Sequence, residues 1–211
     1  HLPKGRTESR LVSSVDILPT ILDAAGIRRR RGDDLDGMSL LPLLNGKPAK
    51  WREHLFTEFT LHWPETYYPG RAVRDSRFKL VHNLLPGRRN PVYDIYLVKQ
   101  RPQTFTPDEV KNMPRHVREA YKIFKQPPEF ELYDLRNDPW EFYNLAEEAS
   151  YAGHLKRLKR LLAEWQERTD DPLRHRRILE KFTAENDATM AGGKYVKKKN
   201  RQWKYPEYFF E

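Results

Sequence analysis

The clearest hydrophobic pattern in the chain lies at 150–168, where apolar residues recur at intervals of three and four positions between charged ones. Such spacing is typical of an α-helix with a single buried face. The sequence therefore predicts an amphipathic helix that packs on a sheet rather than lying on a membrane surface. Its apolar stripe consists of Leu155, Leu158, Leu161, Leu162 and Trp165.

A second helix is predicted over 17–25, which is apolar on most of its sides. Ser13 and Asp16 can cap its start, Pro19 fits a first helical turn, and Gly26 fits its end. A helix with so little polar surface must be buried against something. We therefore expect a core helix of whatever domain it belongs to.

Alternation of apolar and polar residues predicts β-strands in further segments. A tight turn at Asp75-Ser76 joins two of them, and the two-residue period places Phe78 and Leu80, with His82, on one face. The predicted strands cover 55–61, 71–75, 77–83 and 130–135.

Prolines interrupt the long segment 85–128. We expect so long an insertion between strands to have a function or to contact a partner. Within it, Thr106 as a cap and Glu109 at the third helical position predict a short helix over 107–113. Another helix is predicted over 115–124.

The chain becomes polar after Pro172, with a helix predicted over 173–183 and a loosely docked tail over 184–211. Lysines alternate with aromatic residues at 194–204, a pattern that suits single-stranded nucleic acid through stacking and charge. A solvated basic tail explains the same pattern, and no nucleic-acid-binding motif accompanies it. Nucleic acid is therefore the weaker hypothesis for a partner.

Charge and composition narrow the range of partners. The 211 residues carry a net charge of +9, with 33% charged and 38% hydrophobic residues. A basic surface attracts polyanions such as nucleic acid, anionic lipid or sulfated glycan, although a solvated surface without a partner stays an alternative. The chain has no cysteine, which excludes disulfides and thiolate metal sites. No apolar run approaches a membrane span of about 20 residues, so we expect no membrane partner.

Candidate catalytic chemistry is scarce. The histidines have no spacing that would place two of them on one metal, and neither a GxSxG motif nor a phosphate-binding glycine loop occurs. The carboxylates Asp33, Asp34 and Asp36 lack the glutamate that closes an EF-hand loop, and an acidic turn is the simpler interpretation. We predict no catalytic residue, metal site or bound cofactor in this segment.

Two segments carry a family resemblance: LVSSVDILPTILDAAGI at 11–27 and FELYDLRNDPWEFYNLA at 130–146. In that order, with DGMSLLPLLNGK at 36–47 between them and the amphipathic helix after them, they resemble the C-terminal part of the sulfatases. The long segment between the strands and the ending AEWQERTDDP favour the heparan N-sulfatase branch, the N-sulfoglucosamine sulfohydrolases or sulfamidases.

The resemblance implies an α+β fold: a small antiparallel sheet of about four strands packed by a C-terminal helix, preceded by the last helical piece of an alkaline-phosphatase-like α/β domain. Residues 1–50 would be the end of that catalytic domain, 51–172 the sulfatase C-terminal subdomain, and 173–211 a polar basic tail. The helix over 17–25 would then lack its sheet in this chain and be under-supported in isolation.

The resemblance also implies an enzyme that hydrolyses sulfate esters or N-sulfate groups of a sulfated glycan such as heparan sulfate. Its formylglycine nucleophile and its calcium ion would lie on upstream sequence, so this segment alone would be inactive. The residues expected to contact substrate at the rim of the active-site pocket are His62, Trp63, Tyr67 and Arg71. For Arg71, a structural role at the start of a strand stays an alternative.

The expected partners are the sulfated glycan, the missing N-terminal catalytic domain and, in a homodimer, a second copy. The resemblance implies a periplasmic, secreted or lysosomal protein, although no signal peptide is visible. Two rival functions stay open: a non-catalytic polyanion-binding module, and the rear domain of a related phosphoesterase or phosphonate hydrolase.

Overall fold

The computed structural model describes residues 5, 7–28, 32, 34–95, 97, 105–190 and 203–209. Most of the predicted basic stretch, at 194–202, and Asp33 of the acidic turn lie outside the described residues. The chain divides into two compact units, His1–Leu55 and Phe56–Glu211.

The secondary structure follows the predicted order of helices and strands. The strands are β1 (Leu55–Phe59), β2 (Gly70–Arg74), β3 (Phe78–Asn83) and β4 (Phe130–Asp134). The helices are α1 (Ile17–Ala24), α2 (Leu41–Leu44), α3 (Pro91–Asp94), α4 (Pro107–Lys111), α5 (Arg115–Lys125), α6 (Ala152–Arg168), α7 (Arg176–Thr189) and α8 (Tyr205–Tyr208). Short 3-10 turns cover Ser14–Asp16, Pro64–Thr66, Ala149–Tyr151 and Pro172–Arg174. Within the described residues, no helix combines the length and the apolar character that a membrane crossing requires.

The first unit is organised around the buried carboxylate of Asp16. Arg52 donates two hydrogen bonds of 2.5 Å to its oxygens, and the backbone amides of Ser13 and Met38 donate two more at 2.8 and 2.9 Å. Burial alone would raise the pKa of Asp16, but the hydrogen bonds outweigh burial and hold the pKa below its usual value. The residue predicted to cap the first helix therefore also ties together distant parts of the unit.

Helix α1 is poorly covered within this unit. Ile17, Leu18 and Ile21 are each more than half exposed, although apolar side chains on a helix normally face a core. This exposure agrees with the expectation that the helix lacks its supporting sheet here.

The second unit is built on a sheet with the strand order β1-β2-β3-β4. The ladders run antiparallel from Gly70↔Asn83 to Arg74↔Lys79 between β2 and β3, and from Phe78↔Asp134 to His82↔Phe130 between β3 and β4. The prediction of a small four-stranded antiparallel sheet is confirmed.

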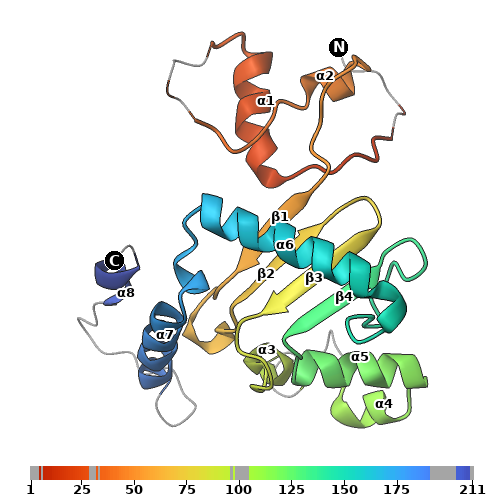
Figure 1. Ribbon diagram of the computed structural model, residues 1–211, viewed down its shortest axis with the longest axis vertical. Helices are drawn as coiled ribbons and strands as arrows, with labels where there is room; N and C mark the ends of the chain where they lie inside the picture. Colours follow the sequence, from red (N-terminus) through yellow and green to blue (C-terminus); the bar gives the residue numbers. More distant parts are fainter. Residues whose placement is uncertain are drawn as a thin grey trace. The chain divides into compact units, whose positions relative to one another are not determined.

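Helix α6 crosses one face of this sheet (Figure 1). Its buried Leu158 and Leu162 pack against Val73, Leu80 and Leu132 of the strands. Burying one such side chain contributes about 1.5–3 kcal/mol, so this layer is the main core of the unit. Leu158, Leu162 and Leu80 are residues that the helical stripe and the strand alternation indicated, whereas Val73 and Leu132 were not singled out.

Helices α3, α4 and α5 occupy the long segment between β3 and β4. In Figure 1, α3 lies near the end of β3, and α4 and α5 lie below β4. The predicted cap is present: Thr106 Oγ1 accepts from the Glu109 amide at 3.2 Å, and the Glu109 carboxylate accepts from the Thr106 amide at 2.7 Å. Tyr93, Leu97 and Val110 form a small core of their own. Helix α3 was not predicted because a single turn has no measurable periodicity.

The helix that follows α6 is longer than predicted. α7 continues to Thr189, into the segment expected to be a loose tail. Ile178 and Phe182 on α7 are buried in a cluster with Leu173 and Tyr67. This stretch therefore belongs to the packed interior of the second unit.

Candidate functional site

The segment predicted to contact substrate is a tight loop between β1 and β2. The buried hydroxyl of Thr66 organises it, since Oγ1 accepts from the backbone amides of His62 and Trp63 at 2.9 and 3.2 Å and donates to the Trp63 carbonyl at 2.9 Å. Pro64 opens the 3-10 turn with its fixed φ. The backbone that carries His62 and Trp63 is thereby held in one conformation.

Helix α7 supports this loop. Asn186 Nδ2 donates to the Pro64 carbonyl at 3.2 Å, and the hydroxyls of Tyr67 and Thr183 share a hydrogen bond of 2.8 Å. The ring of Phe182 meets the ring of Tyr67 edge-on, with centroids 5.3 Å apart. The segment expected to be a tail thus positions the loop.

Two of the predicted residues, His62 and Trp63, are accessible. Both side chains are exposed, and their ring centroids lie 3.9 Å apart. An exposed indole can offer an apolar face to a sugar ring, and the imidazole can donate a hydrogen bond to a sulfate or hydroxyl oxygen. The structure therefore brings together one pair of the predicted residues in a form that can contact a glycan.

Tyr67 is enclosed instead. It is 1% exposed, so neither face of its ring is open to a sugar, and the predicted stacking role does not fit this structure. Burial raises the pKa of its hydroxyl, which stays protonated at neutral pH. Tyr67 belongs to the hydrophobic core under the loop, where its ring packs against Phe182.

The guanidinium of Arg71 is held by a two-point ion pair with Asp171. Its Nε and Nη2 donate to the two carboxylate oxygens at 2.8 Å each, and Nη1 donates to the carbonyls of Phe59 and Gly70 at 3.2 and 3.0 Å. The two side chains are only 3% and 2% exposed, so substrate cannot reach them. The substrate-binding prediction for Arg71 does not fit this burial, whereas its structural alternative does.

Asp171 lies after the end of α6 at Arg168 and begins the turn before α7. Its Oδ2 accepts from Gln166 Nε2 at 2.9 Å, and its Oδ1 accepts from the Leu173 amide at 3.1 Å. Burial alone would raise the pKa of Asp171, but the hydrogen bonds from Arg71 and the other donors lower it overall. A single charged carboxylate therefore connects β2, α6 and the turn that leads into α7.

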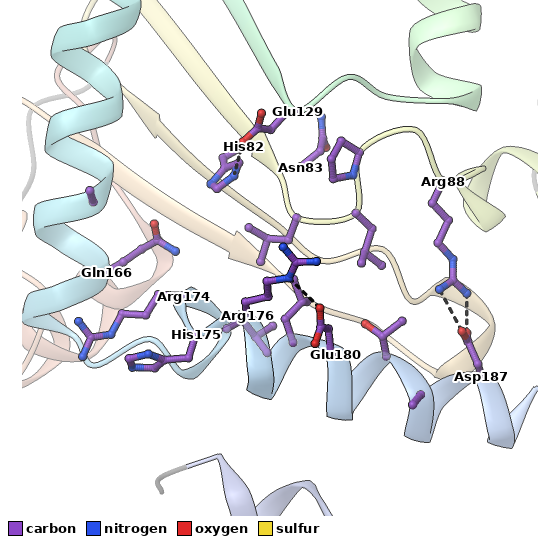
Figure 2. Close-up of a pocket in the computed structure, with 18 of the residues that line it drawn as sticks. His82, Asn83, Arg88, Glu129, Gln166, Arg174, His175, Arg176, Glu180 and Asp187 are labelled. Atoms are coloured by element: carbon purple, nitrogen blue, oxygen red, sulfur yellow. Dashed lines mark hydrogen bonds and ion pairs between the residues drawn. The ribbon is translucent and has the colours of Figure 1, made fainter.

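A pocket of about 1180 Å³ lies between the end of β3, the end of α6 and helix α7 (Figure 2). It is an open groove, a little larger than the roughly 300–1,000 Å³ typical of small-molecule sites. The sequence did not predict it. Among the polar residues that line it are His82, Glu129, Gln166, Arg174, His175 and Arg176.

The arginines of the pocket already have anionic partners. Figure 2 shows Arg88 extending from the loop after β3 to the carboxylate of Asp187 on α7. The other pairs are Arg174–Asp170 and Arg176–Glu180. An anionic ligand would have to displace a carboxylate, so this lining suits a polar ligand with an apolar face better than a highly charged one.

His82 lies at the wall of the pocket, on the sheet face that the strand period predicted. Its ring stacks on Phe130 with centroids 4.6 Å apart, and Nε2 lies 3.9 Å from a carboxylate oxygen of Glu129. Burial lowers the pKa of His82 below its usual 6.5, despite the opposing charge of Glu129. At neutral pH the ring is therefore uncharged and presents one donor and one acceptor.

The described residues contain no group of three or more His, Asp or Glu side chains that could hold a metal ion. The pocket escaped sequence reasoning because its walls come from residues far apart in the chain. The local signals were the polar Gln166 in an amphipathic helix and the apolar Leu173 and Leu179 in a polar stretch.

Comparison with known proteins points to one family. A family model described as N-sulphoglucosamine sulphohydrolase, C-terminal, matches residues 1–113. An ulvan-active sulfatase of Formosa agariphila is 31% identical over 171 residues, which cover 80% of this chain and 31% of that protein. The N-sulphoglucosamine sulphohydrolase of Homo sapiens is 31% identical over 175 residues, which cover 80% of this chain and 34% of that protein.

A solved structure shows the same arrangement. The structure of a 2-O GAG sulfatase matches with a TM-score of 0.51 and 26% sequence identity, over 75% of this chain and 25% of that one. The chain spans about a third of the length of the curated relatives named above.

We expect Arg71→Met to lower the free energy of unfolding by about 3–5 kcal/mol, because it leaves Asp171 buried without its cation. Adding Asp171→Asn should restore part of that loss, since the amide carries no charge. Arg176→Met, which breaks an exposed ion pair, is the matched control and should change stability little. Urea denaturation measures all three, and equal effects of the Arg71 and Arg176 variants would contradict this account.

His82 makes stability depend on pH. Because its pKa is lower in the folded chain than the usual 6.5, the unfolded chain binds this proton more readily, so the stability from neutral His82 is complete above pH 6.5 and declines as the pH falls below it. His82→Phe keeps the stack on Phe130 and removes the proton. The variant should lose less in melting temperature than the parent between about pH 7.5 and 5. An identical decrease in melting temperature for the variant and the parent would show that His82 does not contribute to the pH dependence of stability.

Proposed function

Because the chain belongs to the family described as N-sulphoglucosamine sulphohydrolase, C-terminal, we propose that it is the C-terminal part of a sulfatase that hydrolyses sulfate esters or N-sulfate groups of a sulfated glycan. The observation that carries the proposal is the match over residues 1–113, joined to relatives named as sulfatases of ulvan and of N-sulphoglucosamine. The exposed pair His62 and Trp63 on a fixed loop supports it, since a sugar sulfate offers both an apolar ring face and oxygen acceptors.

The catalytic groups belong to upstream sequence in this proposal. A formylglycine nucleophile and a calcium ion would supply attack at sulfur and neutralisation of the sulfate oxygens, and no described residue of this chain takes either role. The exposed face of α1 supports the same division, because the sheet of an upstream α/β domain would cover Ile17, Leu18 and Ile21. That domain is the first proposed partner, with a second copy in a homodimer as another.

The residues of this chain bind and orient rather than react. Thr66, Asn186 and the buried ring of Tyr67 hold the loop in place. Substrate binding by His62 and Trp63 therefore does not include the entropy cost of ordering the loop. Such a loop contributes the rim of a substrate pocket. A sulfated glycan substrate fits a protein that is periplasmic, secreted or lysosomal, which is where we place it.

The first test is sulfate release by the longer protein that contains this chain. We expect inorganic sulfate from N-sulfated or O-sulfated glucosamine, and little phosphate or phosphonate from phosphodiesters or phosphonate monoesters under the same conditions. Preferred turnover of the phosphorus esters would instead identify the protein as a related phosphoesterase or phosphonate hydrolase. Binding of sulfated glycan without any turnover would favour the polyanion-binding module.

Within that protein, we expect His62→Ala to raise the KM or Kd for the sulfated sugar by tens of fold, corresponding to about 2 kcal/mol of lost contact, while the melting temperature hardly changes. The side chain is exposed, so its removal leaves no cavity. Glu65→Ala, an exposed residue of the same loop, is the control for general disturbance. Unchanged binding by the His62 variant would remove this residue from the site.

A further inference from the structure

The most exposed large apolar side chain in the described part of the second unit is Trp140, at 79%. It lies on the loop that follows β4, together with Tyr143, which is 56% exposed. An indole in water forgoes the gain from burial, so an exposed tryptophan on an ordered loop is a candidate contact for a ligand.

The loop is anchored at both ends. Asp138 is buried, and its Oδ2 accepts from the Tyr143 amide at 2.8 Å. Asn144 Oδ1 accepts from the Leu132 amide at 2.9 Å, and its Nδ2 donates to the Phe130 carbonyl at 3.2 Å, which joins the loop to β4. The backbone that carries Trp140 is therefore held in place by these hydrogen bonds.

The loop also carries backbone strain. Glu141, next to Trp140, has φ +59, in the left-handed region that non-glycine residues rarely adopt. Lys79 Nζ holds its carboxylate with contacts of 2.9 and 2.7 Å to the two oxygens. Strained residues that are held in place in this way cluster at binding sites.

Positive charge flanks the exposed rings. His116, in the first turn of α5, packs on Phe142 and Tyr143 with centroids 4.9 and 6.1 Å away, so the start of this helix lies against the loop. Arg115 precedes His116 and Arg136 lies in the turn before the loop, and both are exposed. Neither makes an ion pair with a carboxylate of the described residues, so both guanidinium groups can bind a sulfate or carboxylate group.

We propose that Trp140 and Tyr143, with Arg115 and Arg136, form a second glycan-binding surface, at which a sugar ring of an anionic polysaccharide stacks on the indole while its sulfate or carboxylate groups pair with the arginines. The loop of His62 precedes Gly70, which pairs with Asn83 at the end of β3, whereas β4 ends beside the start of β3. Arg136, just after β4, therefore lies at the end of the sheet away from that loop. The second surface would hold the polymer and not the reacting unit. This inference rests on the proposed function for the identity of the polymer.

The test compares Trp140→Ala with the parent in the longer protein, with heparin as the polymer and its N-sulfated disaccharide as the small substrate. Losing one stacked ring should raise the KM or Kd for heparin by about tenfold, while kcat and the kinetics of the disaccharide stay as in the parent. Phe105→Ala removes another exposed aromatic ring and should change neither. Arg115→Gln with Arg136→Gln should weaken heparin binding and reduce its dependence on salt.

Three results would overturn the inference. Unchanged heparin affinity of the Trp140 variant would exclude stacking. Equal weakening by the Phe105 variant would show that the effect is not local. A lower melting temperature, with disaccharide kinetics impaired as well, would show that Trp140 packs against another part of the protein. If the parent releases no sulfate, the proposed function fails, whereas heparin affinity measured by titration still decides whether this surface binds.

Discussion

The buried ion pair between Arg71 and Asp171 is the interaction on which the second unit depends. It joins residues 100 positions apart. Because Gln166 of α6 donates to the same carboxylate, β2 is fixed to α6. Asp171 then directs the chain into the turn before α7, since its carboxylate also accepts from the Leu173 amide. A buried pair of this kind contributes little net energy but is costly to break, so its main effect is to define which elements lie together.

The position of α7 explains the candidate site on both of its sides. On one side, Thr183 and Asn186 hold the loop that presents His62 and Trp63. On the other, the helix forms a wall of the pocket that His82 borders. A segment that composition alone marks as a polar tail thus carries the ordering of the loop, and with it the affinity that a preorganised contact provides.

The fold could be predicted to a large extent because its signals are local. The stripe of Leu158 and Leu162 and the alternation of Phe78 and Leu80 identify the core without knowledge of the tertiary structure. The site could be predicted only in part. Sequence does not distinguish an exposed Trp63 from an enclosed Tyr67, because their burial depends on α7, more than a hundred residues later in the chain. The pocket has no contiguous motif for the same reason.

On the proposed function, this segment orients a glycan for chemistry that upstream sequence supplies. The most direct test is the intact mass of the native protein from its source, together with peptide sequencing upstream of His1. We predict a chain much longer than these 211 residues, with a cysteine or serine in a Cys/Ser-x-Pro-x-Arg pattern converted to formylglycine. A native mass equal to that of these residues alone would contradict the account, since no nucleophile would then exist and polyanion binding would become the leading function.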